Sequence, residues 1–414
     1  MRMEIELDGV LDPRIVKERF DTALRDGNPF WVWPDTNRDN WRSALSTIAK
    51  VTREILTCSG QVLEMVGHPK DLSVACFTSG MGPLLGYWLR EGKLTASTET
   101  ASMLELHLEH NHARANCLSR ETEAIVDQMQ AASVPVTLLK GIHTAHNYFP
   151  HPGTRPMSDV DIWVEEDALG KARRILETLG YAPGEYSHGE QVWRRPVSPS
   201  LPRNLYFLHR DDPWSVDLHT SLDRRYSPGS KLIRLDEMFR AKERETWSGS
   251  ASGRCLAGAA LVYHLAFHAS QNPMSLTLLR LTELVMVIRQ LDQSRTVCWE
   301  EFADIGQRNG VPGFIYPAFH LVNKLVPDTV PQDVIRTIEA ATPANVRTIA
   351  SALNPATCHR VVRCSMRERF MWTSGAFGWV REIFGSMWPN APINRIFHTY
   401  RMRIWRIVKG TIQT

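Results

Sequence analysis

The sequence has few cysteines, and they form no recognisable framework. Seven cysteines are scattered over 414 residues at wide spacings, and no C-x-x-C pair occurs. Disulfide-rich domains have an even number of closely spaced cysteines, so a disulfide framework is not expected here. The pattern is typical of a protein from a reducing compartment, and we expect a cytoplasmic location.

Long apolar runs are also missing. A membrane-spanning helix needs about 18 or more consecutive apolar residues. The nearest candidate, residues 256–269, is shorter and contains His264 and His268. The opening residues, MRMEIELDGVLDP, lack the apolar segment of a signal peptide. The sequence therefore predicts neither secretion nor a transmembrane segment.

The chain as a whole lacks an excess of either charge, since 48 lysines and arginines face 45 aspartates and glutamates. Residues 360–414 depart from this balance, with ten basic and two acidic residues and four tryptophans. Basic residues interleaved with aromatic ones are typical of a surface that contacts nucleic acid, an anionic membrane or a protein partner. The alternative, which we favour, is a terminal helix whose tryptophans dock on the protein while its arginines face water.

What is present is a mixture of helical and strand-like patterns. Apolar residues recur at three- and four-residue spacing through residues 1–117 and again through 231–414, which predicts helices. Residues 118–230 alternate between the two patterns. The strand-like segments are residues 135–139, 159–164, 204–209 and 215–222. We therefore expect an α+β protein, with a mixed β-sheet core at 118–230 between N- and C-terminal helical regions.

The stretch TRPMSDVDIWV, residues 154–164, places two aspartates one residue apart in an otherwise apolar strand. Aspartate is disfavoured in strands, so each carboxylate has a local cost. Side chains alternate along a strand, so Asp159 and Asp161 share one face while Val160 and Ile162 point into a core. Two like charges on one face repel unless the face is open to water or a cation lies between them. On this interpretation, replacing one of them leaves the metal-free protein as stable or slightly more stable.

Three neighbouring features predict a ligand site around this pair. Lys140 and Gly141 follow a short strand and precede a helix, an arrangement that brings backbone N–H groups and a lysine to a phosphate. Arg155 precedes the pair in a loop from which it reaches an anionic ligand. Asp217 lies in a later strand and shares its face with His219. The plain alternatives are an ordinary turn with an exposed lysine, a surface arginine, and an edge strand whose polar face meets water.

Three carboxylates on one open sheet face suit a divalent cation. Mg²⁺ (or Mn²⁺) prefers oxygen ligands and leaves coordination positions for nucleotide phosphates. Two such ions, about 4 Å apart, clamp the attacking and leaving oxygens of an in-line displacement. We expect Asp159 and Asp161 to bridge the ions. Asp217 is expected to bind the second ion and to help deprotonate an attacking hydroxyl.

Taken in order, LLKG, TRPMSDVDIWV, a helix ending in LGY, and VDLH resemble the uncharacterised nucleotidyltransferase family of the polymerase-β-like superfamily. The resemblance covers about residues 118–225. It implies a nucleotidyltransferase-like sheet in which Gly141 is the glycine of the phosphate turn. Asp159 and Asp161 match the metal-binding pair, and Asp217 matches the third acid. The wider superfamily has Gly-Gly or Gly-Ser at the turn, so Lys140-Gly141 implies that the phosphates are held differently.

The resemblance also implies a reaction. An NTP, ATP included, would donate its NMP group with Mg²⁺ or Mn²⁺ to a hydroxyl or phosphate acceptor, and pyrophosphate would leave. The acceptor is a small molecule, a peptide or a protein, and family members resemble accessory enzymes of bacterial biosynthetic loci. Lys140, Gly141, Arg155, Ser158 and His219 are then the candidates for nucleotide binding. The alternatives are another phosphoryl transferase, or a non-catalytic protein that binds a nucleotide or RNA. Three clustered acids argue against the binder.

Two more pairs of polar residues lie in the C-terminal region. His264 and His268 are four residues apart, which is a spacing that can bind zinc, but HLAFH lacks the glutamate of H-E-x-x-H. We expect them to be buried, hydrogen-bonded histidines that pack beside the catalytic region. Arg280 and Glu283 are expected to form an ion pair within one helix, with no further role.

Overall fold

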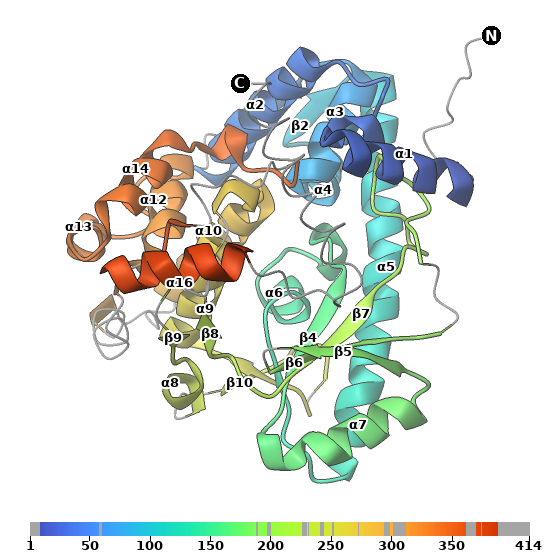
Figure 1. The fold of residues 1–414 in the computed structure, drawn as a ribbon. Coiled ribbons are helices and arrows are strands. Elements are labelled where there is room, and N and C mark those ends of the chain that lie inside the picture. The colour runs from blue at the N-terminus through green and yellow to red at the C-terminus, as the bar shows by residue number, and fades with distance from the viewer. Residues whose placement is uncertain are drawn as a thin grey trace.

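The structure is a computed structural model of the 414-residue chain (Figure 1). The residues that it describes are 9–57, 60–187, 189–196, 200–225, 230, 232–240, 244–250, 252–271, 273–293, 299–300, 312–361, 370–373 and 375–387. Together they form an α+β protein in which helices cover a mixed sheet, as the sequence predicts.

The N-terminal part is helical apart from two short strands. Helix α2 (Arg38–Leu56) is capped by Asn37, and the long helix α5 (Thr98–Ala131) is capped by Ser97. Each cap side chain accepts a hydrogen bond from a backbone N–H of the first turn, which satisfies a donor that the helix leaves free. The other elements are α1 (Pro13–Asp26), η1 (Pro29–Val32), β1 (Leu63–Met65), α3 (Pro69–Ser79), α4 (Gly82–Arg90) and β2 (Leu94–Ala96).

A seven-stranded sheet forms the centre of the described part, in the order β10-β11-β3-β4-β7-β6-β5. Its strands are β3 (Thr137–Leu138), β4 (Asp159–Trp163), β5 (Ala182–Ser187), β6 (Glu190–Arg194), β7 (Ser215–His219), β10 (Arg244–Thr246) and β11 (Arg254–Leu256). Helix α6 (Ile142–Asn147) follows β3, and α7 (Leu169–Thr178) follows β4. A separate small pair is formed by β8 (Arg224–Arg225) and β9 (Leu232–Ile233).

The two faces of the sheet differ in character. Val160 and Ile162 of β4 and Val216 and Leu218 of β7 are fully buried in a core that α5 and α7 complete. The alternating side chains of the same strands project from the opposite face. That face meets residues of α9 (Gly258–Gln271) and α10 (Leu278–Gln293) across two cavities. The sheet therefore has one structural face and one face available for a site.

The C-terminal helices share a second core with the N-terminal helices, so Leu45 of α2 and Leu284 of α10 belong to one buried cluster. The remaining elements here are α8 (Asp236–Arg240), η4 (Pro273–Ser275), η5 (Pro312–Ile315), α12 (Tyr316–Leu325), α13 (Gln332–Ala340), α14 (Ala344–Ala352), η6 (Pro355–Thr357) and α16 (Gly375–Met387). No described helix combines the length and the apolar composition that a membrane span requires.

The ends of these elements differ from the regional boundaries expected from the sequence. Helix α5 runs without a break across residues 117 and 118. Strands β10 and β11 lie after residue 230 and still belong to the sheet, because β11 pairs with β3. The sheet is thus assembled from residues 137–256, and the division into 1–117, 118–230 and 231–414 describes sequence patterns only.

The prediction of a strand at residues 204–209 is wrong. Leu205, Tyr206 and Phe207 are buried, but their backbone polar groups bind side chains instead of a neighbouring strand. The indole Nε1 of Trp33 donates to the Leu205 carbonyl at 2.6 Å, and the Asn204 side chain accepts from the Tyr206 N–H at 2.7 Å. A short apolar run is buried in either conformation, so its composition does not distinguish the two.

Most of the basic tail at 360–414, including Trp388 and Trp405, lies outside the described residues. Trp372 is buried, and its ring stacks on Phe314 with the centroids 4.2 Å apart. Trp379 on α16 is 47% exposed, and its ring stacks on Phe370 with the centroids 4.7 Å apart. Both described tryptophans therefore stack on another ring of the protein, and a contact of the tail with an outside partner stays a prediction.

Candidate active site

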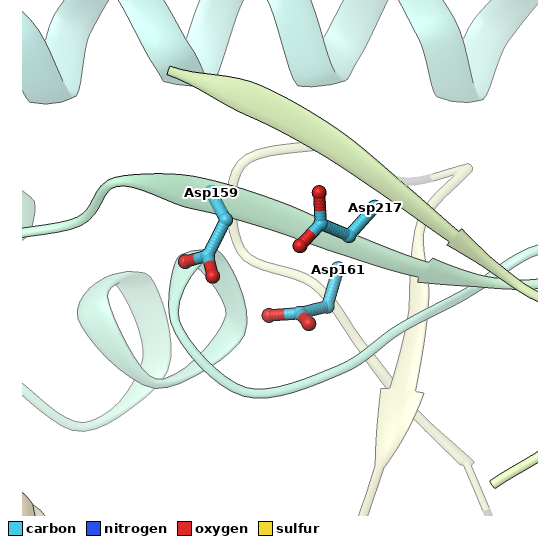
Figure 2. Close-up of side chains that lie close together, drawn as sticks. All are labelled: Asp159, Asp161 and Asp217. Carbon is cyan, nitrogen blue, oxygen red and sulfur yellow. The ribbon is translucent and has the colours of Figure 1, made fainter. Parts of the chain in front are cut away.

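Asp159, Asp161 and Asp217 converge on the open face of the sheet (Figure 2). Strands β4 and β7 are parallel neighbours, and their register places Asp161 directly beside Asp217. One carboxylate oxygen from each residue lies within 4.8 Å of the other two. The alternation predicted for the D-x-D pair is confirmed, and the later strand supplies the third acid to the same face.

Asp161 is nearly inaccessible, and two groups bind its carboxylate. The Lys140 Nζ lies 2.5 Å from Oδ2, and the His219 Nε2 lies 3.1 Å from Oδ1. The Leu139 N–H donates to the Asp161 carbonyl at 3.0 Å, which fixes the next residue, Lys140, beside the carboxylate. Burial alone would raise the pKa of Asp161, but Lys140 and His219 outweigh it and hold that pKa well below its ordinary value.

The hydrogen bonds of His219 define its tautomer. The Arg224 Nη2 lies 3.2 Å from His219 Nδ1, and a guanidinium can only donate. Nδ1 is therefore the acceptor, so Nε2 carries the proton and donates to Asp161. Arg224 also forms an ion pair with Glu190 at 3.0 Å. His219 thus orients Asp161, in addition to lying beside the site as the sequence predicts.

Asp217 has the opposite environment. Its Oδ1 is buried and has no hydrogen-bond partner in the described part of the chain. Burial, followed by the negative charges of Asp161 and Asp159, raises the pKa of Asp217 to about 6. A partnerless carboxylate oxygen next to two other acids is the arrangement that a divalent cation would relieve, so the donor set fits Mg²⁺ or Mn²⁺.

The turn after β3 requires a glycine. Gly141 has a φ of +73°, in the region that L-residues with a side chain avoid, and it caps α6. The conformation turns the chain sharply between Lys140 and α6. The lysine is not the exposed side chain of an ordinary turn, because its side chain is only 15% accessible. Burial by itself would lower the pKa of Lys140, but the charges of Asp161 and Asp159 raise it above its ordinary value, so the amine is charged.

Two cavities meet at these residues. The larger, of about 300 Å³, is lined by Gly141, Arg155, Ser158, His268, Arg280 and Arg360, among others. The smaller, of about 210 Å³, is lined by Glu190, Asp217, His219, His264 and Phe267, among others. Lys140, Asp159 and Asp161 line both, together with His268 and Gln271 of α9. We call these the basic chamber and the smaller chamber, and the shared residues lie at their junction.

Arg155 and Glu283 form an ion pair that the sequence does not predict. The Arg155 Nε lies 2.9 Å from Glu283 Oε1, and Nη2 lies 3.1 Å from Oε2. Glu283 also accepts from the Thr144 hydroxyl of α6. The expected pair of Arg280 and Glu283 within α10 is therefore wrong, because Glu283 points to the sheet region and ties α10 to it. Arg155 lines the basic chamber, but with its charge already balanced.

His264 and Arg280 are residues whose part in the site the sequence missed. His264 is 7% exposed, and neither ring nitrogen has a hydrogen-bond partner among the described residues. The expectation of a buried histidine is confirmed, and the expectation that it is hydrogen-bonded is wrong. Arg280 lines the basic chamber. The one available signal for each was a polar residue within an apolar helix, a pattern too common to assign a role.

Comparison with protein families adds an independent result. A family model described as uncharacterised nucleotidyltransferase matches residues 69–327, which is more than half of the chain. The chain belongs to this family. The match includes every strand of the large sheet and both helices that face the carboxylates, so the resemblance predicted for residues 118–225 is confirmed and extended. Neither the curated proteins nor the solved structures gave a significant match. Arg360 lies beyond the end of the nucleotidyltransferase match.

Proposed function

We propose that this nucleotidyltransferase moves an NMP group from an NTP to a hydroxyl or phosphate acceptor, with release of pyrophosphate. The observation that carries the proposal is the position of the three acids. Asp159 and Asp161 line both chambers, whereas Asp217 lines only the smaller chamber. Donor and acceptor would then meet at the shared carboxylates.

Asp159, Asp161 and Asp217 would hold Mg²⁺ or Mn²⁺. The partnerless Oδ1 of Asp217 and the mutual proximity of the three carboxylates support this assignment. When bound, a divalent ion would neutralise charge on the attacking and leaving oxygens of the displacement. His219 would keep Asp161 oriented, because its Nε2 donates to Oδ1 at 3.1 Å.

The polyphosphate of the donor would occupy the basic chamber. Lys140, Gly141, Arg155 and Ser158 all line it. Cationic side chains form strong hydrogen bonds with phosphate oxygens. Lys140 is bonded to Asp161, so it would turn to the phosphates when a metal ion takes over that carboxylate. Arg155 would present a guanidinium group in a fixed position to the phosphates, since Glu283 holds that group in place.

The acceptor would occupy the smaller chamber, which we therefore call the acceptor chamber from here on. Its oxygen would attack the α-phosphorus, the bond to the bridging oxygen of the β-phosphate would break, and pyrophosphate would leave with the bonding electrons. A hydroxyl acceptor would give its proton to Asp217, which lines this chamber. His264 would donate or accept a hydrogen bond with the acceptor through its partnerless nitrogens. The wide cysteine spacing supports a cytoplasmic location for the reaction.

Two other functions use the same chambers: another phosphoryl transfer, and nucleotide or RNA binding without turnover. Asp217 favours transfer over binding, because a binder gains nothing from a third, half-buried carboxylate with one partnerless oxygen. Phosphoryl transfer differs in the group that reaches the acceptor. A label on the α-phosphorus remains with the product of nucleotidyl transfer, and a label on the γ-phosphorus remains with the product of γ-phosphoryl transfer.

The test is to incubate the protein with each NTP, labelled in turn at the α- or γ-phosphorus, with Mg²⁺ and a cell extract. Transfer of the α-label with release of pyrophosphate is expected from the wild type and not from Asp217→Asn. Asp292→Asn, which removes an exposed carboxylate near the end of α10, is the matched control and should retain transfer. Nucleotide binding without transfer of either label would favour the binder.

A further inference from the structure

The basic chamber contains two arginines that form no direct ion pair with any of the described residues. Within the described residues, the side chains of Arg280 and Arg360 form neither a hydrogen bond nor an ion pair, although both line the chamber. The other two cations of the chamber differ. Lys140 forms an ion pair with Asp161, and Arg155 forms one with Glu283. Two of the four cations are therefore available to a ligand.

The structure fixes the positions of both arginines through the backbone. Arg280 lies in the first turn of α10, where its N–H donates to the Thr277 carbonyl at 3.1 Å. The Leu278 N–H that begins the same helix donates to the Cys358 carbonyl at 3.0 Å. Two residues later, the Arg360 N–H donates to the Thr78 carbonyl at 2.9 Å, near the end of α3. Residues 358–360 are thus held between α3 and α10, which delivers Arg360 to the rim of the chamber next to Arg280.

Two neighbouring guanidinium groups repel each other, while the nearby carboxylates of Glu283 and Asp159 attract Arg280 without a direct ion pair. Burial, and then the positive charge of Arg360, lowers the pKa of Arg280. Arg280 is half-buried and Arg360 is exposed, so both guanidinium groups remain accessible to a ligand in the chamber. Guanidinium groups bind phosphate oxygens in a fork geometry that a lysine does not reproduce. The arrangement is therefore suited to an anion with more than one phosphate.

We infer that Arg280 and Arg360 bind the terminal phosphates of the donor and make the protein selective for triphosphates. The inference rests on the proposed function, from which it takes that the donor is an NTP. Lys140, Asp159 and Asp161 lie at the junction with the acceptor chamber, so the reacting phosphate belongs there. The β- and γ-phosphates then extend into the basic chamber toward the two arginines. Because Arg360 lies beyond residues 69–327, the C-terminal region outside the family match contributes directly to the site.

Calorimetric titration with inorganic tripolyphosphate, an NTP and the corresponding NMP, without divalent metal, tests the inference. Arg280→Gln and Arg360→Gln are each expected to weaken tripolyphosphate and NTP binding by roughly tenfold to a hundredfold, the range for a hydrogen bond to a charged group. NMP binding should be unchanged. Arg336→Gln, which removes an exposed arginine on α13, is the matched control and should leave all three affinities unchanged. Unchanged tripolyphosphate affinity in both site variants would overturn the inference.

A second measurement on the wild type does not depend on whether the variants fold. Phenylglyoxal modifies accessible arginines, and mass spectrometry identifies the modified positions. Tripolyphosphate should protect Arg280 and Arg360 and should not protect Arg336. Equal modification of all three with and without tripolyphosphate would also overturn the inference.

The inference and the proposed function fail in different ways. Protection of both arginines in a protein that transfers no label from any NTP would reject the transferase and leave a polyphosphate-binding site. Transfer of the α-label with no effect of the arginine variants on tripolyphosphate affinity would reject the arginine site and leave the transferase.

Discussion

The ammonium of Lys140 lies 2.5 Å from Oδ2 of Asp161, so a lysine balances the charge of the second acid in β4. Both side chains are largely inaccessible, at 15% for Lys140 and 4% for Asp161. The sequence raised two ways to tolerate adjacent acids, an open face or a cation between them. The structure shows a third arrangement, in which one of the acids has its own cation. The expectation that removing either charge relieves repulsion is therefore wrong for Asp161.

Breaking this pair should destabilise the metal-free protein. We expect Lys140→Met and Asp161→Asn each to lower the free energy of unfolding by about 3 kcal/mol, because each leaves a buried charge without its partner. The double variant should lose less than the sum, which urea denaturation of all four proteins in chelator measures as a coupling energy. Strictly additive losses would show that the two side chains do not stabilise each other.

The contribution of the ion pair between Lys140 and Asp161 to the free energy of unfolding should depend on pH in a defined direction. The folded-state pKa of Asp161 is depressed, so its contribution is present above the ordinary value of 3.8 and is lost as the pH falls below it. The cost of Asp161→Asn should accordingly be constant near neutral pH and shrink in acid. A cost that grows on acidification would contradict the ion pair.

Lys140 should compete with a metal ion for Asp161. Removing the lysine frees a carboxylate oxygen, so Lys140→Met should bind Mn²⁺ more tightly than the wild type does when no nucleotide is present. The same variant should bind an NTP more weakly in the presence of metal, because it lacks a cation in the basic chamber. Calorimetric titration of the wild type and of Lys140→Met with Mn²⁺ and with an NTP should show these two opposite changes in affinity. Arg254→Met, which removes an exposed cation of β11, should change neither affinity.

Removing the charge of Asp217 should stabilise the metal-free protein, which is the effect expected from the sequence for Asp159 and Asp161. In the folded protein the Asp217 carboxyl group keeps its proton up to about pH 6, whereas in the unfolded chain it releases the proton near its ordinary pKa of 3.8. The wild type therefore loses stability as the pH rises between these two values. Asp217→Asn has no such proton to lose. Without metal, it should be more stable than the wild type by about 1 kcal/mol above pH 7, after allowance for partial exposure, and equally stable near pH 4. Denaturation at both pH values measures the difference, and a destabilised variant at neutral pH would show that Asp217 has a structural role.

Local rules were enough to predict the acids and the three strands β3, β4 and β7, but not the other four strands of the sheet. Alternation along a strand places Asp159 and Asp161 on one face, and the same rule places Asp217 with His219. These statements need only the sequence of one strand at a time. The predicted helices at the N-terminal end follow from apolar spacing in the same local way.

The partners of the charged residues could not be predicted, because they depend on how distant elements pack. Arg155 and Glu283 are 128 residues apart, and the expected partner of Glu283, Arg280, was the nearest in sequence. Arg280 and Arg360 meet because the backbone of residues 358–360 bonds to both α10 and α3. No periodicity in the sequence contains that information. The acids, Lys140 and Arg155 could be placed at the site from the sequence, whereas the partners of the charged side chains and the presence of Arg280 and Arg360 could not.

His264 provides the last prediction, which separates a ligand-binding histidine from a packing one. Burial lowers its pKa to about 3, so the ring is neutral at physiological pH, and neither nitrogen has a partner among the described residues. An unsatisfied buried polar group costs about 1–3 kcal/mol, so His264→Leu should leave the metal-free protein equally stable or raise its melting temperature. Once an acceptor is identified, the same variant should raise the KM for that acceptor, because the acceptor chamber has lost its donor and acceptor nitrogens. His320→Leu is the matched control, since His320 of α12 also has a partnerless buried nitrogen but lines neither chamber. A destabilised His264→Leu variant with an unchanged acceptor KM would identify His264 as a packing residue.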